Sequence, residues 1–266
     1  NLSSAIERRK MIPKIIHFCW LSDDPIPSNL VAYMQTWKEK LPDYEFIKWD
    51  LEKFPKESSR WVTEAFDNKK YAFAADYIRL YAVYHYGGIY LDMDVEVLKS
   101  FDELLNFPYM LAYENEKRNG IEAGVFGAEK NNAYIKKFFD SYFDKKFVRE
   151  DGSFDLTPLP LIMQQALDDF DEKLEIYDCN YFTAKSFDTG EEFPTEKTFT
   201  IHHFAGSWKS DKEKELISES QRLSKKYGKF LGRNIAEYRF AIREKGKKAI
   251  FTLTWDKIKR KFRKVK

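Results

Sequence analysis

Cysteine is scarce in this sequence, and long apolar runs are missing from it. The two cysteines, Cys19 and Cys179, form no CxxC motif and lie among apolar residues, so we expect buried free thiols in a reducing compartment. No run of about 18 apolar residues occurs, which argues against a membrane-spanning helix. Residues 1–10 have no apolar core of the signal-peptide kind. We therefore expect a cytoplasmic protein.

A strong overall charge is also missing, but the charge is unevenly distributed. The 266 residues carry a net charge of +2. Residues 239–266, the basic tail, contain twelve basic and two acidic side chains, a net charge of +10, which leaves −8 for the rest of the chain. Such asymmetry indicates a separate partner for the tail. Because the body is acidic and holds no nucleic-acid-binding motif, we expect no nucleic-acid partner.

The predicted elements alternate between strands and helices. Helical patterns at 28–41 and 71–86 alternate with β-rich runs at 14–20 and 44–49. This order is typical of an α/β sheet with parallel strands. We expect further strands at 109–114, 124–129 and 199–204, and further helices near 131–143 and 158–169.

No repeat and no Gly/Ser linker interrupts the chain, and 43% of its residues are apolar, enough for a large core. We therefore predict one catalytic-type α/β domain at residues 11–209. A helical, basic C-terminal extension is expected at residues 210–266.

Two aspartates stand at the end of an apolar run, in the stretch GGIYLDMDVE (87–96). Residues two apart on a strand point the same way, so Asp92 and Asp94 should share one side and Met93 the other. Two carboxylates on one side suit a hard divalent cation such as Mg²⁺ or Mn²⁺. An isolated D-x-D pair also occurs on solvated turns, but unpaired carboxylates beside a buried strand would be costly without a cation.

Three motifs, in order, resemble those of the glycosyltransferases of family 32. They are IPKIIHFCW (12–20), AFAADYIRLYAVYHYGGIYLDMDVE (72–96) and IHHFAGSW (201–208). The resemblance implies a GT-A-like, Rossmann-type sheet that binds a nucleotide-sugar donor, with Mn²⁺ (or Mg²⁺) as cofactor and retention of the anomeric configuration. It does not cover the chain beyond Ser210.

The resemblance also implies the ligands of the metal. Asp94 would bind it directly, and Asp92 would touch the ribose or sugar and reach the metal directly or through water. His202 aligns with a histidine of the family and would complete the shell. On a strand, His202 and His203 face opposite ways, so only one of them can point at the site.

Asp76 and Arg79 are three apart on the helix expected at 71–86, so they are neighbours on one face. A surface ion pair of this spacing contributes only roughly 0.2–0.5 kcal/mol. The surrounding positions are apolar, and in similar enzymes the matching residues hold sugar hydroxyls and phosphate. We therefore favour a functional pair, with Arg79 helping to neutralise the departing diphosphate.

Other residues are expected at the donor. Trp20 would stack on the base, and Ser207 and Trp208 would donate hydrogen bonds to phosphate, with core packing an equal alternative for Trp208. Tyr90 lines either the donor pocket or the core, and we expect His17 to be structural. The complete donor-binding set is Trp20, Asp76, Arg79, Tyr90, Asp92, Ser207 and Trp208.

The expected reaction is hexosyl transfer from a nucleoside diphosphate sugar to a hydroxyl of a glycan acceptor. A UDP-hexose is favoured, with GDP-mannose as the alternative donor, and we expect a lipid-linked acceptor in bacterial surface polysaccharide synthesis at the inner membrane face. Retention requires same-face attack or a covalent intermediate, for which Glu114 and Glu122 are candidate carboxylates that no spacing separates.

Two functions other than sugar transfer are alternatives. A metal-dependent phosphohydrolase would need an aspartate near the first strand, and HFCW (17–20) has none. A catalytically inert nucleotide- or sugar-binding protein is the alternative from a different class.

The basic tail contains an apolar stripe. Residues 251, 255, 258, 262 and 265 recur at spacings of 4, 3, 4 and 3, which predicts one apolar helix face surrounded by lysine and arginine. Such a helix binds anionic membranes peripherally, or packs on the body of its own protein. We favour the membrane. The stripe residues are Phe251, Trp255, Ile258, Phe262 and Val265.

Overall fold

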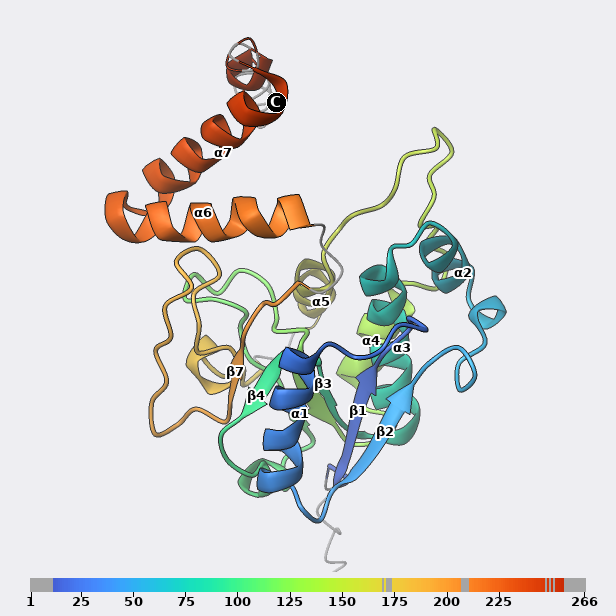
Figure 1. The fold of residues 1–266 in the computed structure, drawn as a ribbon. Coiled ribbons are helices and arrows are strands. Elements are labelled where there is room, and N and C mark those ends of the chain that lie inside the picture. The colour runs from blue at the N-terminus through green and yellow to red at the C-terminus, as the bar shows by residue number, and fades with distance from the viewer. Residues whose placement is uncertain are drawn as a thin grey trace, which may run out of the picture. The chain divides into compact units, whose positions relative to one another are not determined.

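The computed structural model describes residues 12–168, 170, 174–206, 211–246, 248, 250 and 252–255, and the chain divides into two compact units (Figure 1). The first unit comprises Asn1–Lys185 and Glu192–Ala205, and the second comprises Ser186–Glu191 and Gly206–Lys266. All strands of the described residues belong to the first unit. The domain boundaries expected from the sequence stay a prediction.

The strands of the first unit form two sheets. They are β1 Ile15–Cys19, β2 Glu45–Trp49, β3 Gly88–Leu91, β4 Val95–Val97, β5 Tyr109–Met110, β6 Val125–Ala128 and β7 Thr200–His202. The larger sheet has the order β2-β1-β3-β6-β5. Its strands β2, β1 and β3 are parallel, as predicted, whereas β6 and β5 add antiparallel pairs. The α/β class is confirmed, with a mixed rather than a parallel sheet.

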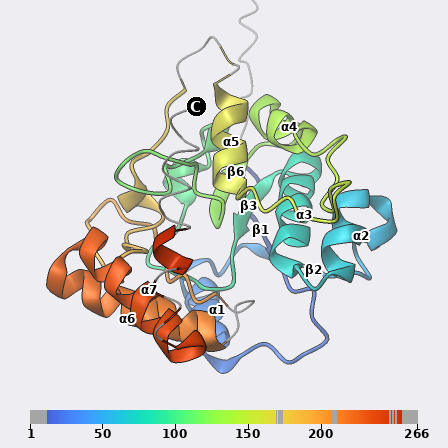
Figure 2. The same cartoon turned by 90° about the horizontal axis from the view of Figure 1, so that it is seen from above.

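Helices cover both faces of the larger sheet. The helices of the first unit are α1 Ser28–Lys40, α2 Arg60–Asp67, α3 Tyr71–Tyr86, α4 Ala133–Asp140 and α5 Leu159–Leu167. Successive residues of β3 alternate between two cores, because strand side chains point to opposite faces. Tyr90 lies in the core that α3 covers, whereas Ile89 and Leu91 lie in the core that receives Trp37 of α1. Figure 2 shows α3 and α1 on different sides of the strands β1 and β3.

Two glycines connect α3 directly to β3, as the sequence predicts. Gly87 and Gly88 have φ angles of +70° and +105°, which side chains with a Cβ rarely adopt. A Cβ added to Gly88 would also come within 2.7 Å of the Ile15 carbonyl oxygen on the neighbouring strand. The chain therefore leaves the helix and enters the sheet without a loop, which places the end of β3 beside α3.

His17 has the structural role expected for it. Its buried ring accepts a hydrogen bond from Trp49 Nε1 at 3.1 Å and donates from Nε2 to the Gly87 carbonyl at 2.8 Å. Burial lowers the pKa of His17 to about 4. Cys19 and Cys179 are buried free thiols, also as predicted.

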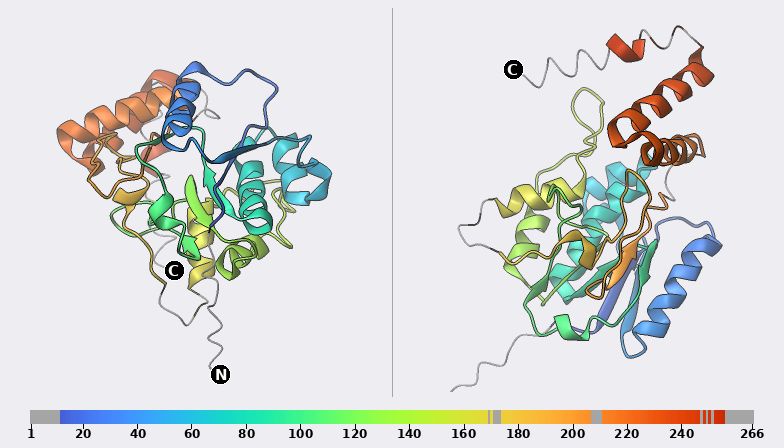
Figure 3. Two further views of the ribbon diagram at one scale, coloured as in Figure 1. Left: turned by 90° about the horizontal axis from the view of Figure 1, so that it is seen from below. Right: turned by 90° about the vertical axis from the view of Figure 1, so that its left-hand side faces the viewer.

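The second unit contains a helical hairpin, which confirms the helical C-terminal extension. Helices α6 Asp211–Tyr227 and α7 Lys229–Lys245 are joined at Gly228, whose φ is +83° (Figures 1 and 3). A Cβ added to Gly232 would collide with the backbone of Ser224, so the two helices pack closely near the turn.

The described residues include no helix that is long and apolar enough to cross a membrane. Of the apolar stripe predicted in the basic tail, Trp255 is described and is exposed. Phe251, Ile258, Phe262 and Val265 lie outside the described residues.

Candidate functional site

Asp92 and Asp94 lie in the turn that leads from β3 to β4. The backbone amide of Val95 donates to the Asp92 carbonyl at 3.1 Å, and the amide of Asp92 donates to the Gly124 carbonyl at 2.8 Å. The two carboxylates share one side, as predicted, and Met93 packs in the core. Strand alternation was the wrong reason for this prediction. The two carboxylates lie in a turn, and the turn brings them together.

His202 joins the two aspartates from the late strand β7. Strands β4 and β7 pair in antiparallel register with Val95 opposite His202, which carries the imidazole to Asp94. His202 Nε2 lies 3.4 Å from Asp94 Oδ1. Ligand atoms of Asp92, Asp94 and His202 all lie within 4.8 Å of one another. The structure thus brings together the three residues expected to bind the metal.

His203 points away from this cluster, as the alternation of a strand requires. Its Nε2 lies 2.8 Å from Glu96 Oε2, and its Nδ1 lies 3.0 Å from Lys185 Nζ. The ring stacks on Tyr33 with centroids 4.4 Å apart. Of the two histidines that the sequence left open, His202 is therefore the one that lies with the aspartates.

Gly124 leaves the space in which the cluster sits. An added Cβ would come within 2.7 Å of His202 Cε1 and 3.0 Å of Asp92 Oδ2. No other residue type fits this position without moving the histidine or the carboxylate. The sequence reasoning missed Gly124, because its importance lies in a contact with residues far away in the chain.

Glu122 lies behind His202 and holds its second ring nitrogen. Its Oε1 is 3.1 Å from His202 Nδ1 and accepts the Gly124 amide at 2.7 Å. Its Oε2 accepts the Thr183 hydroxyl at 2.5 Å, and the residue is only 1% exposed. Both oxygens are engaged, which fits a residue that orients His202 better than the nucleophile that the sequence suggested as one option.

Arg79 connects Asp92 to α3. Its guanidinium lies 3.3 Å from the Asp92 carboxylate and 3.2 Å from Asp76, and it donates to the Ala123 carbonyl at 2.7 Å. The Tyr90 hydroxyl donates to Asp92 Oδ1 at 2.9 Å. Asp76, Arg79 and Tyr90 are all buried, so the pair on α3 is not the surface ion pair considered as its alternative. Their contact with a donor stays a prediction.

The charges of the cluster depend on one another. Burial raises the pKa of Asp92, and the charge of Asp94 adds to this effect while Arg79 opposes it. Burial alone would also raise the pKa of Asp94, but His202 and hydrogen bonds lower it to about 2. The Glu122 and Asp94 carboxylates outweigh burial and raise the pKa of His202 well above its usual range. Without a cation, a protonated His202 thus compensates the carboxylates.

This donor set fits a divalent cation. Two carboxylates and one imidazole are ligands that Mn²⁺ and Mg²⁺ accept, with Mn²⁺ the better match for the nitrogen. Gly124 provides the room, and a carboxylate behind the ligating imidazole is the usual arrangement at metal sites. Asp92, Asp94 and His202 would hold the ion, and a cation would replace the proton that His202 otherwise shares with Asp94.

The remaining predicted residues lie elsewhere or outside the described part. Trp20 follows β1 and donates from its indole nitrogen to the Asp24 carbonyl at 2.9 Å, and no contact found among the described residues joins it to the aspartates. Ser207 and Trp208 lie outside the described residues. Glu114 is partly buried, and burial together with the Glu122 charge raises its pKa to about 7.

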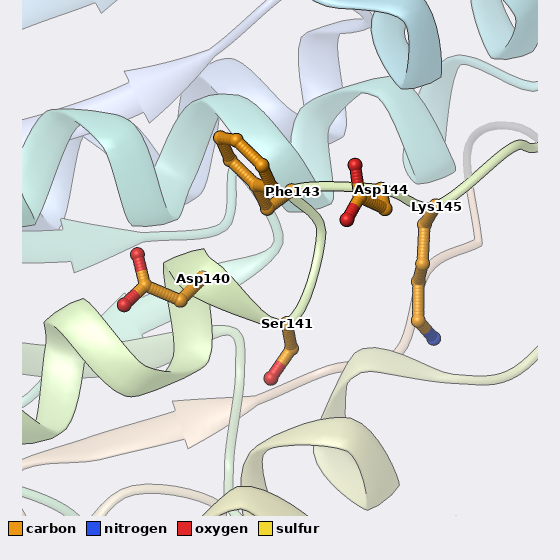
Figure 4. A pocket seen from close by; sticks show the side chains of 5 residues that line it. All are labelled: Asp140, Ser141, Phe143, Asp144 and Lys145. Carbon is orange, nitrogen blue, oxygen red and sulfur yellow. The ribbon is translucent and has the colours of Figure 1, made fainter.

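A separate hollow of about 650 Å³ lies on the surface next to the end of α4 (Figure 4). None of the residues expected at the site lines it, and the Phe143 side chain at its wall is exposed. The predicted metal and donor site therefore corresponds to the aspartate cluster and not to this hollow. The lining residues are Asp140, Ser141, Phe143, Asp144 and Lys145.

Comparison with known proteins gives this cluster a context. Residues 27–111 match the family described as "Glycosyltransferase sugar-binding region containing DXD motif". The segment is similar to a glycosyltransferase sugar-binding region. It contains Asp76, Arg79, Asp92 and Asp94, whereas Glu122 and His202 follow it in the chain.

Two curated relatives of this chain come from fungi. A mannosyl phosphorylinositol ceramide synthase of Saccharomyces cerevisiae is 34% identical over 142 residues, which are 51% of this chain and 36% of the relative. The inositol phosphoceramide mannosyltransferase 3 of Schizosaccharomyces pombe is 32% identical over 128 residues, 47% of this chain and 35% of the relative. The chain thus spans about a third of the length of these two proteins.

A solved structure, the PaToxG glycosyltransferase, is similar to 59% of this chain and 69% of its own, with 22% identity and a TM-score of 0.45.

Proposed function

We propose that this chain is a metal-dependent, retaining glycosyltransferase, which moves a hexose from a nucleoside diphosphate sugar to a hydroxyl acceptor. The observation that carries the proposal is the convergence of Asp92, Asp94 and His202 from distant parts of the sequence. The match of the surrounding segment to a DXD sugar-binding region supports it. A cation at the diphosphate is what a DXD-type site would supply, and among the described residues this cluster could hold one.

A divalent cation held by Asp92, Asp94 and His202 would supply positive charge for the departing diphosphate. The chain's own residues orient the ligands. Glu122 accepts the Nδ1 proton of His202 and so leaves Nε2 free to face Asp94 and the ion. A fixed ring orientation matters because a displaced ligand weakens the charge compensation that leaving-group departure needs.

Arg79 and Tyr90 orient Asp92 in the same way. The hydroxyl of Tyr90 and the guanidinium of Arg79 bind the carboxylate from the side of α3. Asp76 in turn binds Arg79 and balances its charge. We propose that this row of contacts holds Asp92 toward the ribose or sugar of the donor, and that Arg79 adds positive charge beside the diphosphate.

The related proteins bear on the choice between the candidate donors. The sequence favours a UDP-hexose as donor. The names of both fungal relatives describe mannosyl transfer, which favours the alternative donor GDP-mannose. Both names also describe a ceramide lipid that carries inositol phosphate. We propose a lipid-linked hydroxyl as the acceptor. A bacterial surface-polysaccharide pathway stays a prediction from the sequence.

A panel of nucleotide sugars tests the proposal. UDP-glucose, UDP-galactose, UDP-N-acetylglucosamine and GDP-mannose are each incubated with the full chain and Mn²⁺, and nucleoside diphosphate release is measured with and without EDTA. We expect metal-dependent release with one donor and, with an acceptor present, a product whose anomeric configuration by NMR matches that of the donor. Release of phosphate from phosphate esters would support a phosphohydrolase instead. Donor binding without turnover would support the inert binding protein.

A further inference from the structure

The turn of the helical hairpin exposes a continuous stretch of side chains. We name residues 225–231, with the sequence KKYGKFL, the hairpin tip; all seven are exposed. The chain reverses direction at Gly228, whose positive φ makes it the single residue between the end of α6 and the start of α7. Close packing at Gly232 and the buried Leu223 hold the two helices together just behind the turn. The exposed residues thus project from a well-supported corner.

Three large apolar side chains are concentrated in this tip. Phe230 is 85% exposed, Leu231 is 52% exposed and Tyr227 is 45% exposed. Single exposed apolar residues are common on soluble proteins and need no partner. A Tyr, a Phe and a Leu within five residues of one turn, by contrast, form a small apolar patch that a partner can cover.

Basic side chains surround the patch. Residues 222–233 contain five lysines or arginines and no acidic residue, and the two arginines pair with Glu219 and Glu237. Lys225 and Lys226 have no carboxylate partner among the described residues, and Lys226 lies over the Tyr227 ring at 5.1 Å. Lys229 pairs only loosely with Asp188, at 3.9 Å. The tip therefore presents uncompensated positive charge directly beside exposed apolar groups.

This combination matches the chemistry of an anionic membrane surface. Acidic lipid headgroups attract lysines, and the layer beneath them accepts aromatic and aliphatic side chains, so that both features of the tip gain partners together. We propose that residues 225–231 are a membrane-docking tip, which inserts Tyr227, Phe230 and Leu231 into the interface of an anionic bilayer while the lysines contact its headgroups. This role is independent of the transfer reaction and of the apolar stripe predicted in the basic tail.

Vesicle co-sedimentation of the full chain tests the tip. The vesicles contain phosphatidylcholine alone or phosphatidylcholine with phosphatidylserine. We expect the wild type to bind the anionic vesicles and to release them at high salt, because screening weakens the lysine contribution. The variant Phe230→Ser/Leu231→Ser should bind at least about tenfold more weakly. Lys225→Glu/Lys226→Glu should lose about 25-fold or more, since each lysine near an anionic surface contributes about fivefold.

Matched variants in the first unit provide the controls. Phe143→Ser removes an equally exposed phenylalanine, and Lys38→Glu/Lys40→Glu makes the same charge change on the exposed side of α1. Both should bind vesicles like the wild type. Circular dichroism checks that all variants keep their helix content, and donor hydrolysis in the absence of lipid should be the same in the tip variants and the wild type.

Three outcomes would overturn the proposal. The first is a wild type that does not bind the anionic vesicles. The second is a pair of tip variants that bind as well as the wild type, which would place membrane binding elsewhere, for example in the basic tail. The third is a chain that forms dimers in solution and becomes monomeric in Phe230→Ser/Leu231→Ser without a change in vesicle binding, because the patch would then be covered by a second copy.

Discussion

Proteins usually bury apolar side chains and expose charged ones. The aspartate cluster and the hairpin tip are opposite exceptions to this rule. In the cluster, ionisable groups are buried or partly buried, and every one of them has a partner: Arg79 and Tyr90 for Asp92, His202 for Asp94, and Glu122 for His202. In the tip, apolar groups are exposed and two lysines have no carboxylate partner among the described residues. Buried charge and exposed apolar surface both cost free energy unless something compensates them.

The two regions differ in where the groups that offset this free-energy cost are found. The charged groups of the aspartate cluster are paired mostly with other residues of the chain. Substitutions there should therefore change both function and the stability of the fold. The exposed groups of the hairpin tip would be paired by a partner outside the chain. Substitutions there should therefore change binding and leave the stability of the fold nearly unchanged. The following predictions test the cluster side of this comparison, from the largest effect to the smallest.

Asp94→Asn should abolish most metal-dependent turnover. One carboxylate ligand is lost, and the diphosphate charge is then poorly compensated, so we expect a loss of about a thousandfold in kcat. Donor hydrolysis in Mn²⁺ measures it. His202→Gln should show a loss of the same kind. His203→Gln is the matched control, because its ring points to Glu96, and it should keep wild-type Mn²⁺ dependence. Full turnover of Asp94→Asn, or of the wild type in excess EDTA, would contradict the metal site.

Arg79→Ala should destabilise the fold strongly. The substitution leaves the buried Asp76 and the partly buried Asp92 without their cationic partner, and removing one partner of a buried ion pair typically costs about 3–5 kcal/mol. Urea unfolding measures this free energy. Lys136→Ala removes an exposed ion pair with Asp140 on α4 and should leave the free energy of unfolding nearly unchanged. Equal costs for the two variants would mean that the network around Arg79 is no tighter than a surface pair.

Glu122→Gln should weaken metal binding while the fold stays intact. A carboxylate behind a ligating histidine typically contributes about 10- to 100-fold to metal affinity. Mn²⁺ titration followed by electron paramagnetic resonance gives the affinity directly. Glu96→Gln is the control, since Glu96 makes the corresponding contact to His203 at 2.8 Å. Unchanged Mn²⁺ affinity in Glu122→Gln would leave Glu122 with a purely structural role.

The sequence predicts the local parts of this arrangement well and the long-range parts poorly. Helix α3 is found as predicted, because its apolar run ends at two glycines whose conformation no other residue adopts easily. The aspartate pair is recognisable because two carboxylates follow an apolar strand. Gly124 and Glu122 are different, since both contact His202, and Gly124 also leaves room for Asp92; no local pattern reveals these contacts.

Pairing between distant strands explains the other differences. The register that sets Val95 opposite His202 joins residues that lie far apart in the sequence, and neither β4 nor β7 alone indicates its partner. The same holds for the antiparallel pairing of β6 with β3, where the sequence pattern of an α/β protein favours parallel strands. The break that the sequence predicts between the two strands is found at Asp92–Asp94, and the argument from strand alternation fails because both carboxylates lie within that turn.

The smallest predicted effect concerns a buried ionisable group without a charged partner. His17 binds only the neutral groups of Trp49 and Gly87, so its pKa falls from 6.5 to about 4. Between pH 6.5 and pH 4 the unfolded chain binds a proton that the folded chain does not, so this residue makes stability decrease as the pH falls through that range. Above pH 6.5 both states are neutral and the effect disappears.

His17→Gln should remove this part of the pH dependence. The difference in unfolding free energy between wild type and variant, measured by urea unfolding, should change by up to about 2 kcal/mol from pH 6.5 to pH 5. His85→Gln is the control, because the His85 ring is only partly buried and should contribute a smaller slope. A difference that is the same at both pH values would mean that His17 becomes charged in the folded protein. A buried charge would then be tolerated without the partners that every charged group of the aspartate cluster has.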